Sequence, residues 1–243
     1  MLWLLILPLG IAAGTLGGVV GFGSSVLIMP ALVAAYGPKE AVPIMALAAL
    51  MANASRVAVW WREVDWRLNA AYCATAVPGA ALGARALIGL DARFLEGMLG
   101  LFLIAMIPGR RWLAARGISI GLGGMAVLGA FIGFLSGLVA TTGPINTPFF
   151  LAYGLVKGAY ISTEAVGSAA ISMTKSIVFQ RFGVLPVETM ARGLAVGSTL
   201  MLGSWLAKRI VLRFDAAQFR LLLEVMMMLA GVALIWGALV SYA

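Results

Sequence analysis

One glycine-rich stretch occurs twice in the chain, and it limits what the chain can fold into. The first copy runs from Gly14 to Pro30 and the second from Gly133 to Pro148, and Gly14 and Gly18 lie 119 residues before Gly133 and Gly137. Each copy places glycines, hydroxyl side chains and a proline inside a long apolar run. In lipid, a broken helix is tolerated only where protein or a polar cavity satisfies the freed backbone groups. Two such breaks at matching positions of two halves indicate a transporter binding site.

The composition favours a helical membrane protein. Of the 243 residues, 63% are hydrophobic and only 11% are charged, whereas about 25% of the residues in a soluble domain are charged. Transmembrane barrels alternate polar and apolar residues, but these runs are apolar throughout. We therefore predict an all-α polytopic protein that crosses the cytoplasmic (inner) membrane several times. Met1 to Leu4 lack the basic region of a signal peptide, so we expect the first segment to remain in the protein.

The net charge of +8 arises from short basic clusters between the apolar runs, such as Arg110, Arg111 and Arg116. Such clusters are typical of cytoplasmic loops, and they favour contact with anionic lipid and anionic substrates over nucleic acid. The chain has one cysteine, Cys73, and no histidine. We therefore expect no intrachain disulfide, no Cys/His metal site and no cofactor.

Two homologous halves follow from the duplication. We predict a first repeat at 1–108, a short basic linker at 109–117 and a second repeat at 118–243. Each half begins with a broken run and continues with shorter spans. The broken runs are 2–36 and 118–156, with a turn predicted at 157–163; the spans are 41–61, 68–90 (interrupted at Pro78-Gly79), 94–107, 164–180 and 187–207, and a last helix opens at Asp215.

The topology depends on whether each broken run crosses the membrane. If it crosses once, the halves are parallel and the loop Lys and Arg residues divide almost evenly between the two sides. If it enters, breaks and returns as a V-shaped hairpin, the halves are inverted. Most basic loop residues then share one side, leaving Lys39, Arg93 and Arg181 on the other. That bias agrees with the positive-inside rule, so we favour inverted halves.

The breaks are the first candidate site. Half-helix N-terminal ends carry unsatisfied N–H groups and partial positive charge, so they bind oxyanions. Small residues also allow close helix packing, which suits Gly14 and Gly18 better than a site. Two pairs at i, i+3 add polar groups: Asn53 with Arg56, and Ser172 with Lys175, again 119 residues apart. The expected substrate-binding residues are Gly21, Phe22, Gly23, Ser24, Ser25, Asn53, Arg56, Thr141, Thr142, Gly143, Pro144, Asn146 and Lys175.

Charged residues inside the spans have two interpretations. Intramembrane Arg and Lys are costly and usually functional, but Arg56 and Lys175 each lie six residues from a charged end and could extend toward it. Glu40 and Glu164 follow the broken run of each half and are candidates for proton coupling. Either glutamate could instead cap a helix start.

Several of these features resemble the TauE/SafE sulfite exporter family. Asp65-Trp66-Arg67 is similar to the family's short polar loop, and Gly83-Ala84-Arg85, followed by Asp91 and Arg93, is similar to its Gly-Ala-Arg stretch. The resemblance covers essentially the whole chain. It implies a transporter, usually an exporter, of sulfite, sulfonates, thiosulfate or other small organosulfur anions. The second break, which reads Ala140-Thr141-Thr142-Gly143-Pro144, departs from the glycine run of the family.

We therefore expect a secondary transporter of small oxyanions, with its site at the two breaks near the bilayer midplane. No segment resembles an ATP-binding loop. A passive anion channel with the same lining is the alternative. An intramembrane enzyme is less favoured, because it would need a nucleophile with a base, paired acids or a metal set. The expected partners are the anion, membrane lipid and a coupled proton, with no nucleic acid, and the protein is expected to be a monomer or homodimer.

Overall fold

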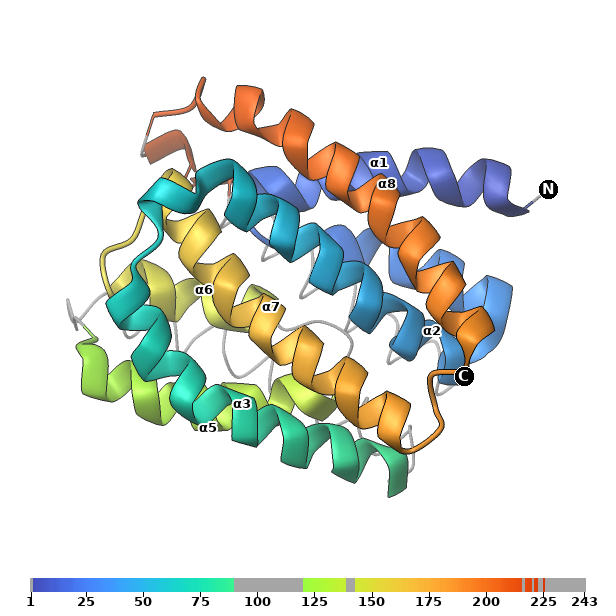
Figure 1. Ribbon diagram of the computed structural model, residues 1–243. Helices are drawn as coiled ribbons and strands as arrows, with labels where there is room; N and C mark the ends of the chain where they lie inside the picture. The colour runs from blue at the N-terminus through green and yellow to red at the C-terminus, as the bar shows by residue number, and fades with distance from the viewer. Residues whose placement is uncertain are drawn as a thin grey trace.

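A computed structural model of the chain describes residues 2–89, 120–138 and 143–215, with a few further positions up to 225. Within these residues the chain forms helices and no strand (Figure 1). The helices are α1 (Leu2–Val20), α2 (Ser24–Trp60), the 3-10 turn η1 (Trp61–Glu63), α3 (Trp66–Gly89), α5 (Leu122–Leu138), α6 (Gly143–Ala152), α7 (Lys157–Arg181) and α8 (Val187–Val211). The expected span 94–107, the linker 109–117 and most of the last helix lie outside the described residues.

The chain reverses direction between α1 and α2. Gly21 and Gly23 have φ angles of 86° and 102°, in the left-handed region that only glycine adopts readily. Gly17 packs beside Ser24 and Gly10 beside Ile28, so the first part of α2 runs back along α1. Gly37, with φ 74° and ψ 163°, then interrupts α2. We call residues 38–60, the part of α2 that follows Gly37, the distal segment of α2.

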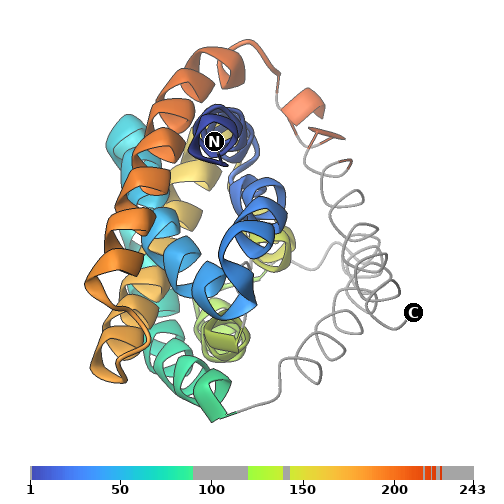
Figure 2. The same ribbon diagram turned by 90° about the vertical axis from the view of Figure 1, so that its right-hand side faces the viewer.

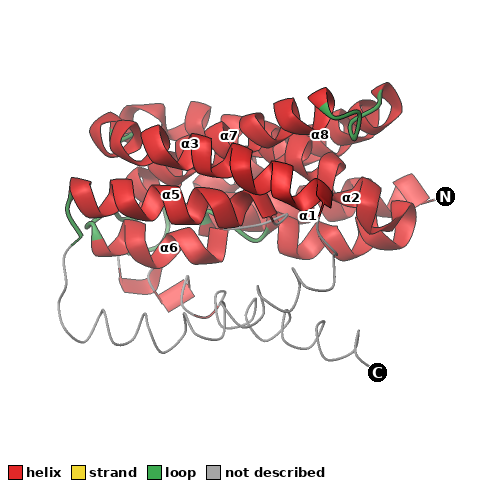
Figure 3. Cartoon of the chain, turned by 90° about the horizontal axis from the view of Figure 1, so that it is seen from below, coloured by secondary structure: helices red, strands yellow, loops and turns green. Residues whose placement is uncertain are grey.

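Four long helical segments form one row, in the order α8, distal segment of α2, α7, α3 (Figure 1). Figure 2 shows this row from its edge, with α1 and α5 lying on one side of it. Seen from below, α3, α7 and α8 lie in one layer and α1, α5 and α6 in a second (Figure 3). Helix α1 packs on α8, and α5 packs on α3. Each predicted half therefore contributes its first helix to the other half.

The two central helices of the row run antiparallel. Arg56, near the end of α2, contacts Glu164, near the start of α7. At the other end, Ala46 and Phe179 share a buried apolar cluster. Helices α1 and α8 run parallel instead, because Gly10 of α1 packs on Thr199 of α8, while Gly18, further along α1, packs on Ser204 and Ala207, further along α8.

Among the described residues, two helical segments are long and apolar enough to cross a membrane, Glu40–Glu63 and Trp66–Ile88. Shorter apolar helices include Ile6–Val20 and Leu122–Leu138. Large apolar side chains such as Trp205 on α8 and Val127 on α5 are exposed. Since exposed apolar surface on this scale is rare in soluble monomers, the outer face suits lipid.

Two local expectations were wrong. Residues 157–163, predicted as a turn, form the first turns of α7, where Tyr160 is buried. Helix α3 continues through Pro78 rather than being interrupted there. Gly79 of α3 and Gly203 of α8 both lie against the backbone of the first helix of the opposite half.

Candidate functional site

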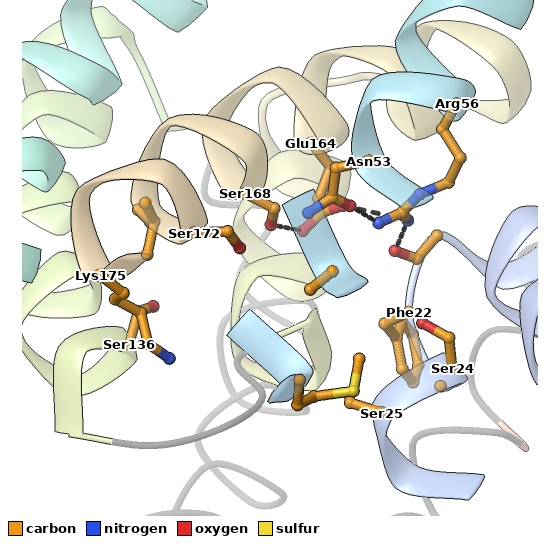
Figure 4. Close-up of a pocket in the computed structure, with 15 residues that line it drawn as sticks. Phe22, Ser24, Ser25, Asn53, Arg56, Ser136, Glu164, Ser168, Ser172 and Lys175 are labelled. Atoms are coloured by element: carbon orange, nitrogen blue, oxygen red, sulfur yellow. Dashed lines mark hydrogen bonds and ion pairs between the residues drawn. The ribbon is translucent and has the colours of Figure 1, made fainter. Parts of the chain in front are cut away.

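A cavity of about 50 Å³ lies between the α1–α2 reversal, the distal segment of α2 and α7. One water needs roughly 10–15 Å³ of such volume, so the cavity accommodates a few waters or a small polyatomic anion. Its lining is largely polar (Figure 4). The lining residues are Gly21, Phe22, Gly23, Ser24, Ser25, Met45, Ala49, Asn53, Arg56, Ser136, Glu164, Ser168, Ile171, Ser172 and Lys175.

The two helices that face each other across the cavity contribute corresponding positions. Four pairs of lining residues are separated by 119 residues, the spacing of the duplicated glycines. They are Met45 with Glu164, Ala49 with Ser168, Asn53 with Ser172 and Arg56 with Lys175. Positions at i, i+4, i+8 and i+11 lie on one face of a helix, so each helix presents one complete face to the cavity.

At one end of the cavity, Arg56 has several partners. Its guanidinium donates to Asn53 Oδ1 and to the carbonyl of Gly21, and its Nη1 lies 3.4 Å from Glu164 Oε2. Arg56 and Glu164 are 6% and 1% exposed. A buried ion is tolerated only when it is paired and hydrogen-bonded, and this pair meets that requirement. The Gly21 carbonyl is available because the helix ends there.

Three further residues hold Glu164 in place. Ser168, one turn later on α7, donates to its Oε1. Asn146 of α6 donates to the same oxygen at 3.4 Å and accepts a hydrogen bond from the Tyr72 hydroxyl at 2.9 Å. Asn146 thus lies behind Glu164 and does not line the cavity. This network fixes the carboxylate toward Arg56.

The opposite end of the cavity has a different chemistry. Lys175 is 4% exposed and lies three residues beyond Ser172 on the same face of α7, about 16 Å from Glu164 along the helix axis. Ser136 of α5 also reaches this end (Figure 4). Its hydroxyl is buried and has no hydrogen-bond partner within the described part of the chain. Because buried polar atoms nearly always have a partner, an orphan hydroxyl in a cavity indicates a ligand or water.

The expected site residues fall into three groups. Gly21 to Ser25, Asn53, Arg56 and Lys175 line the cavity, and Glu164 joins them. Glu40 lies apart, half-exposed, in an ion pair with Arg192 at 2.5 Å. Thr141 and Thr142 lie outside the described residues. Gly143 and Pro144 open α6, although nothing is described of their side chains.

Sequence reasoning did not select Ser136 and Ser168. The signal for Ser168 is its position one turn after Glu164 on the cavity face, four residues before Ser172. The signal for Ser136 is weaker, because a serine among glycines is also typical of close helix packing. Only the packing of α5 on α3 brings it to the cavity.

Comparison with known proteins places the chain in a family. Searches of curated proteins and of solved structures return no significant match. A family model described as sulfite exporter TauE/SafE matches residues 6–234, which is essentially the whole chain. The helical fold, the apolar outer surface and the polar cavity agree with membrane transport. The chain therefore belongs to the TauE/SafE sulfite exporter family of membrane transporters.

Proposed function

We propose that this protein is a secondary transporter that exports a small organosulfur or sulfite-type oxyanion across the inner membrane, without chemically altering it. The anion binds in the cavity between the distal segment of α2 and α7. The observation that carries the proposal is the composition of the Lys175 end, where a buried ammonium and two serines, one of them with an orphan hydroxyl, line one small space.

An oxyanion suits this end of the cavity for two reasons. A sulfite or sulfonate group presents several acceptor oxygens, which match the donors of Lys175, Ser136 and Ser172. Arg56 is held by Glu164, Asn53 and Gly21. The second reason is charge: the described lining contains two basic side chains, Arg56 and Lys175, and one acid, Glu164, and this excess of positive charge favours an anion.

We also propose that the two halves are inverted and that each begins with a re-entrant hairpin. The antiparallel arrangement of α2 and α7 supports this, because a two-fold axis in the membrane plane relates such helices. The reversal at Gly21–Gly23 and the return of the first part of α2 along α1 support the hairpin in the first half. Alternation of access would then occur around the cavity between the halves.

Counterflow in proteoliposomes tests the proposal. Sulfite, thiosulfate, sulfoacetate and sulfate are offered in turn, and saturable exchange of at least one of them is expected. Lys175→Gln should reduce apparent affinity by about ten- to a hundredfold, since a hydrogen bond to a charged group is worth about 1.5–3 kcal/mol. Lys175→Arg should retain part of the affinity, and Ser136→Ala should reduce it by about two- to tenfold.

Matched controls separate the site from general effects on folding. Lys157→Gln makes the same chemical change at the start of α7, away from the cavity, and Ser198→Ala removes an exposed hydroxyl of α8. Both should exchange like wild type. Equal affinity in wild type and Lys175→Gln would place the anion elsewhere. Flux that does not saturate would favour a channel.

A further inference from the structure

The ion pair at the Arg56 end suggests how transport is coupled to protons. This inference rests on the proposed function. We infer that Glu164 is a proton-linked switch. An oxyanion that passes from the Lys175 end of the cavity to Arg56 displaces the Glu164 carboxylate, and the displaced carboxylate takes up one proton. The anion and the proton are therefore bound together.

The first step of the argument is competition for one guanidinium. The Glu164 carboxylate and a substrate oxyanion are both negative groups with acceptor oxygens, and both suit Arg56. Asn53 and the Gly21 carbonyl hold the guanidinium independently of Glu164, whose Oε2 lies 3.4 Å from Arg56 Nη1. Arg56 can therefore exchange one acceptor for another without losing its position.

The second step concerns what happens to Glu164. The carboxylate is 1% exposed, so a charge that has lost Arg56 is left without compensation in a nonpolar region. A buried carboxylate in that state is neutralised by a proton. Protonated Glu164 then needs acceptors, and Ser168 Oγ and the Asn146 amide already lie against its Oε1. The network that orients the carboxylate can therefore also accommodate the acid after an amide flip.

The third step excludes other groups near Glu164 as the proton site. Among the described elements that pack around it, the titratable or charged neighbours are Arg56 of α2, Tyr72 of α3 and Tyr160 of α7, with Lys175 further along the cavity. Arginine stays protonated. The two tyrosine hydroxyls are engaged with Asn146 and Thr147. Lys175 lies about 16 Å from Glu164 along the helix axis and does not share Arg56 with it. Glu164 is thus the group that loses its counter-ion when an anion binds Arg56.

The expected consequence is positive linkage between the proton and the anion. Protonation of Glu164 frees Arg56, so anion affinity should rise as pH falls, by up to about tenfold per pH unit while one proton is coupled. A monoanion then crosses with its proton as a neutral pair. Export proceeds when the internal anion concentration outweighs an opposing proton gradient.

Calorimetry on the purified full-length protein in detergent tests the inference. The probes are thiosulfate and sulfate, because neither changes charge around neutral pH. Binding is measured in two buffers of different ionisation enthalpy, which gives the number of protons taken up. We expect about one proton per bound anion for wild type and none for Glu164→Gln, whose affinity should no longer rise as pH falls. Glu40→Gln is the matched control and should behave as wild type.

The outcomes distinguish the inference from the proposed function. Binding by wild type without proton uptake would overturn the inference, and so would equal uptake by wild type and Glu164→Gln. The wild-type proton count needs no variant, so it decides even if Glu164→Gln does not fold. If wild type binds neither probe and exchanges none of the four oxyanions in proteoliposomes, the proposed function fails, and the inference fails with it.

Discussion

The distal segment of α2 and helix α7 occupy matching positions but carry different chemistry. Both are long helices at the centre of the row, and both present positions spaced by 119 residues to the cavity. The segment of α2 contributes Met45 and Ala49 where α7 contributes Glu164 and Ser168. The basic residue is kept in both, as Arg56 and Lys175. The acid and its hydroxyl partner are present in only one.

This difference shows that helix packing and the charge of the cavity depend on the duplication in different ways. Glycines at matching positions let α1 approach α8 and α5 approach α3, so the two halves pack in the same way at these contacts. The ion pair uses the duplication asymmetrically, because in the described cavity lining Glu164 of α7 pairs with Arg56, whereas α2 has Met45 at the position that matches Glu164. A symmetric cavity with two such acids would neutralise both bases and leave no net attraction for an anion.

The largest effect is expected in a test of whether the two matching helices end on opposite faces of the membrane. Arg62 and Arg181 are exposed, are 119 residues apart and follow the cavity-lining faces of the two helices. In a Cys73→Ala background, Arg62→Cys and Arg181→Cys should differ completely in labelling by an impermeant maleimide applied from outside. Both should label after permeabilisation. Labelling of both from the same side would show that the halves are parallel.

A second test removes the chemical asymmetry. Glu164→Met gives α7 the residue that α2 has at the matching position, and it leaves Arg56 buried without its carboxylate. Breaking a buried pair in this way costs about 3–5 kcal/mol. The double variant Arg56→Met with Glu164→Met should recover most of that stability, although it should lose proton-linked binding. Thermal unfolding in detergent measures both.

The control for this test is Glu188→Met, which removes an exposed acid of α8 that is paired with Arg192. Surface pairs contribute about 0–1 kcal/mol, so its unfolding should stay close to wild type. Equal loss of stability in Glu164→Met and Glu188→Met would mean that the buried ion pair has no special role in the fold.

The sequence predicted several residues that line the cavity, because helical spacing and the 119-residue offset can both be read from the sequence without knowing how the helices pack. Asn53, Arg56 and Lys175 were expected at the site on this basis, and they line the cavity. Glu164 was expected only as a proton-coupling candidate that follows the second broken run. Ser136 could not be predicted in this way, because its approach to the cavity depends on the packing of α5 against α3, which the sequence does not specify. Glu40 was treated like Glu164 because both follow a broken run, but the two positions differ by five residues in the repeat. Glu40 therefore lies near Arg192 of α8 rather than in the cavity.

The same limit explains the first turns of α7. The stretch from Lys157 to Thr163 has the glycine and polar residues of a turn, and we predicted one. In the structure Gly158 packs on Trp60, and Tyr160 is buried with its hydroxyl bonded to Thr147. Tertiary contacts of this kind override local preference. The central row of helices is consequently longer at this end than the sequence indicated.

The smallest expected effect concerns the glycines that hold the outer helices together. A Cβ added to Gly79 would lie 2.5 Å from the carbonyl oxygen of Ala130, and one added to Gly203 would lie 2.5 Å from the backbone nitrogen of Thr15. Backbone cannot move aside cheaply, so Gly79→Ala and Gly203→Ala should each cost about 1–3 kcal/mol by overpacking. Gly123→Ala, at an open position of α5 with nothing within 4 Å of the new atom, should be neutral or slightly stabilising, because alanine favours helix. Similar losses of thermal stability in the first two variants would support equivalent packing of the halves. A loss at only one of them would show that the helix contacts of the two halves have diverged, as the cavity residues have in their chemistry.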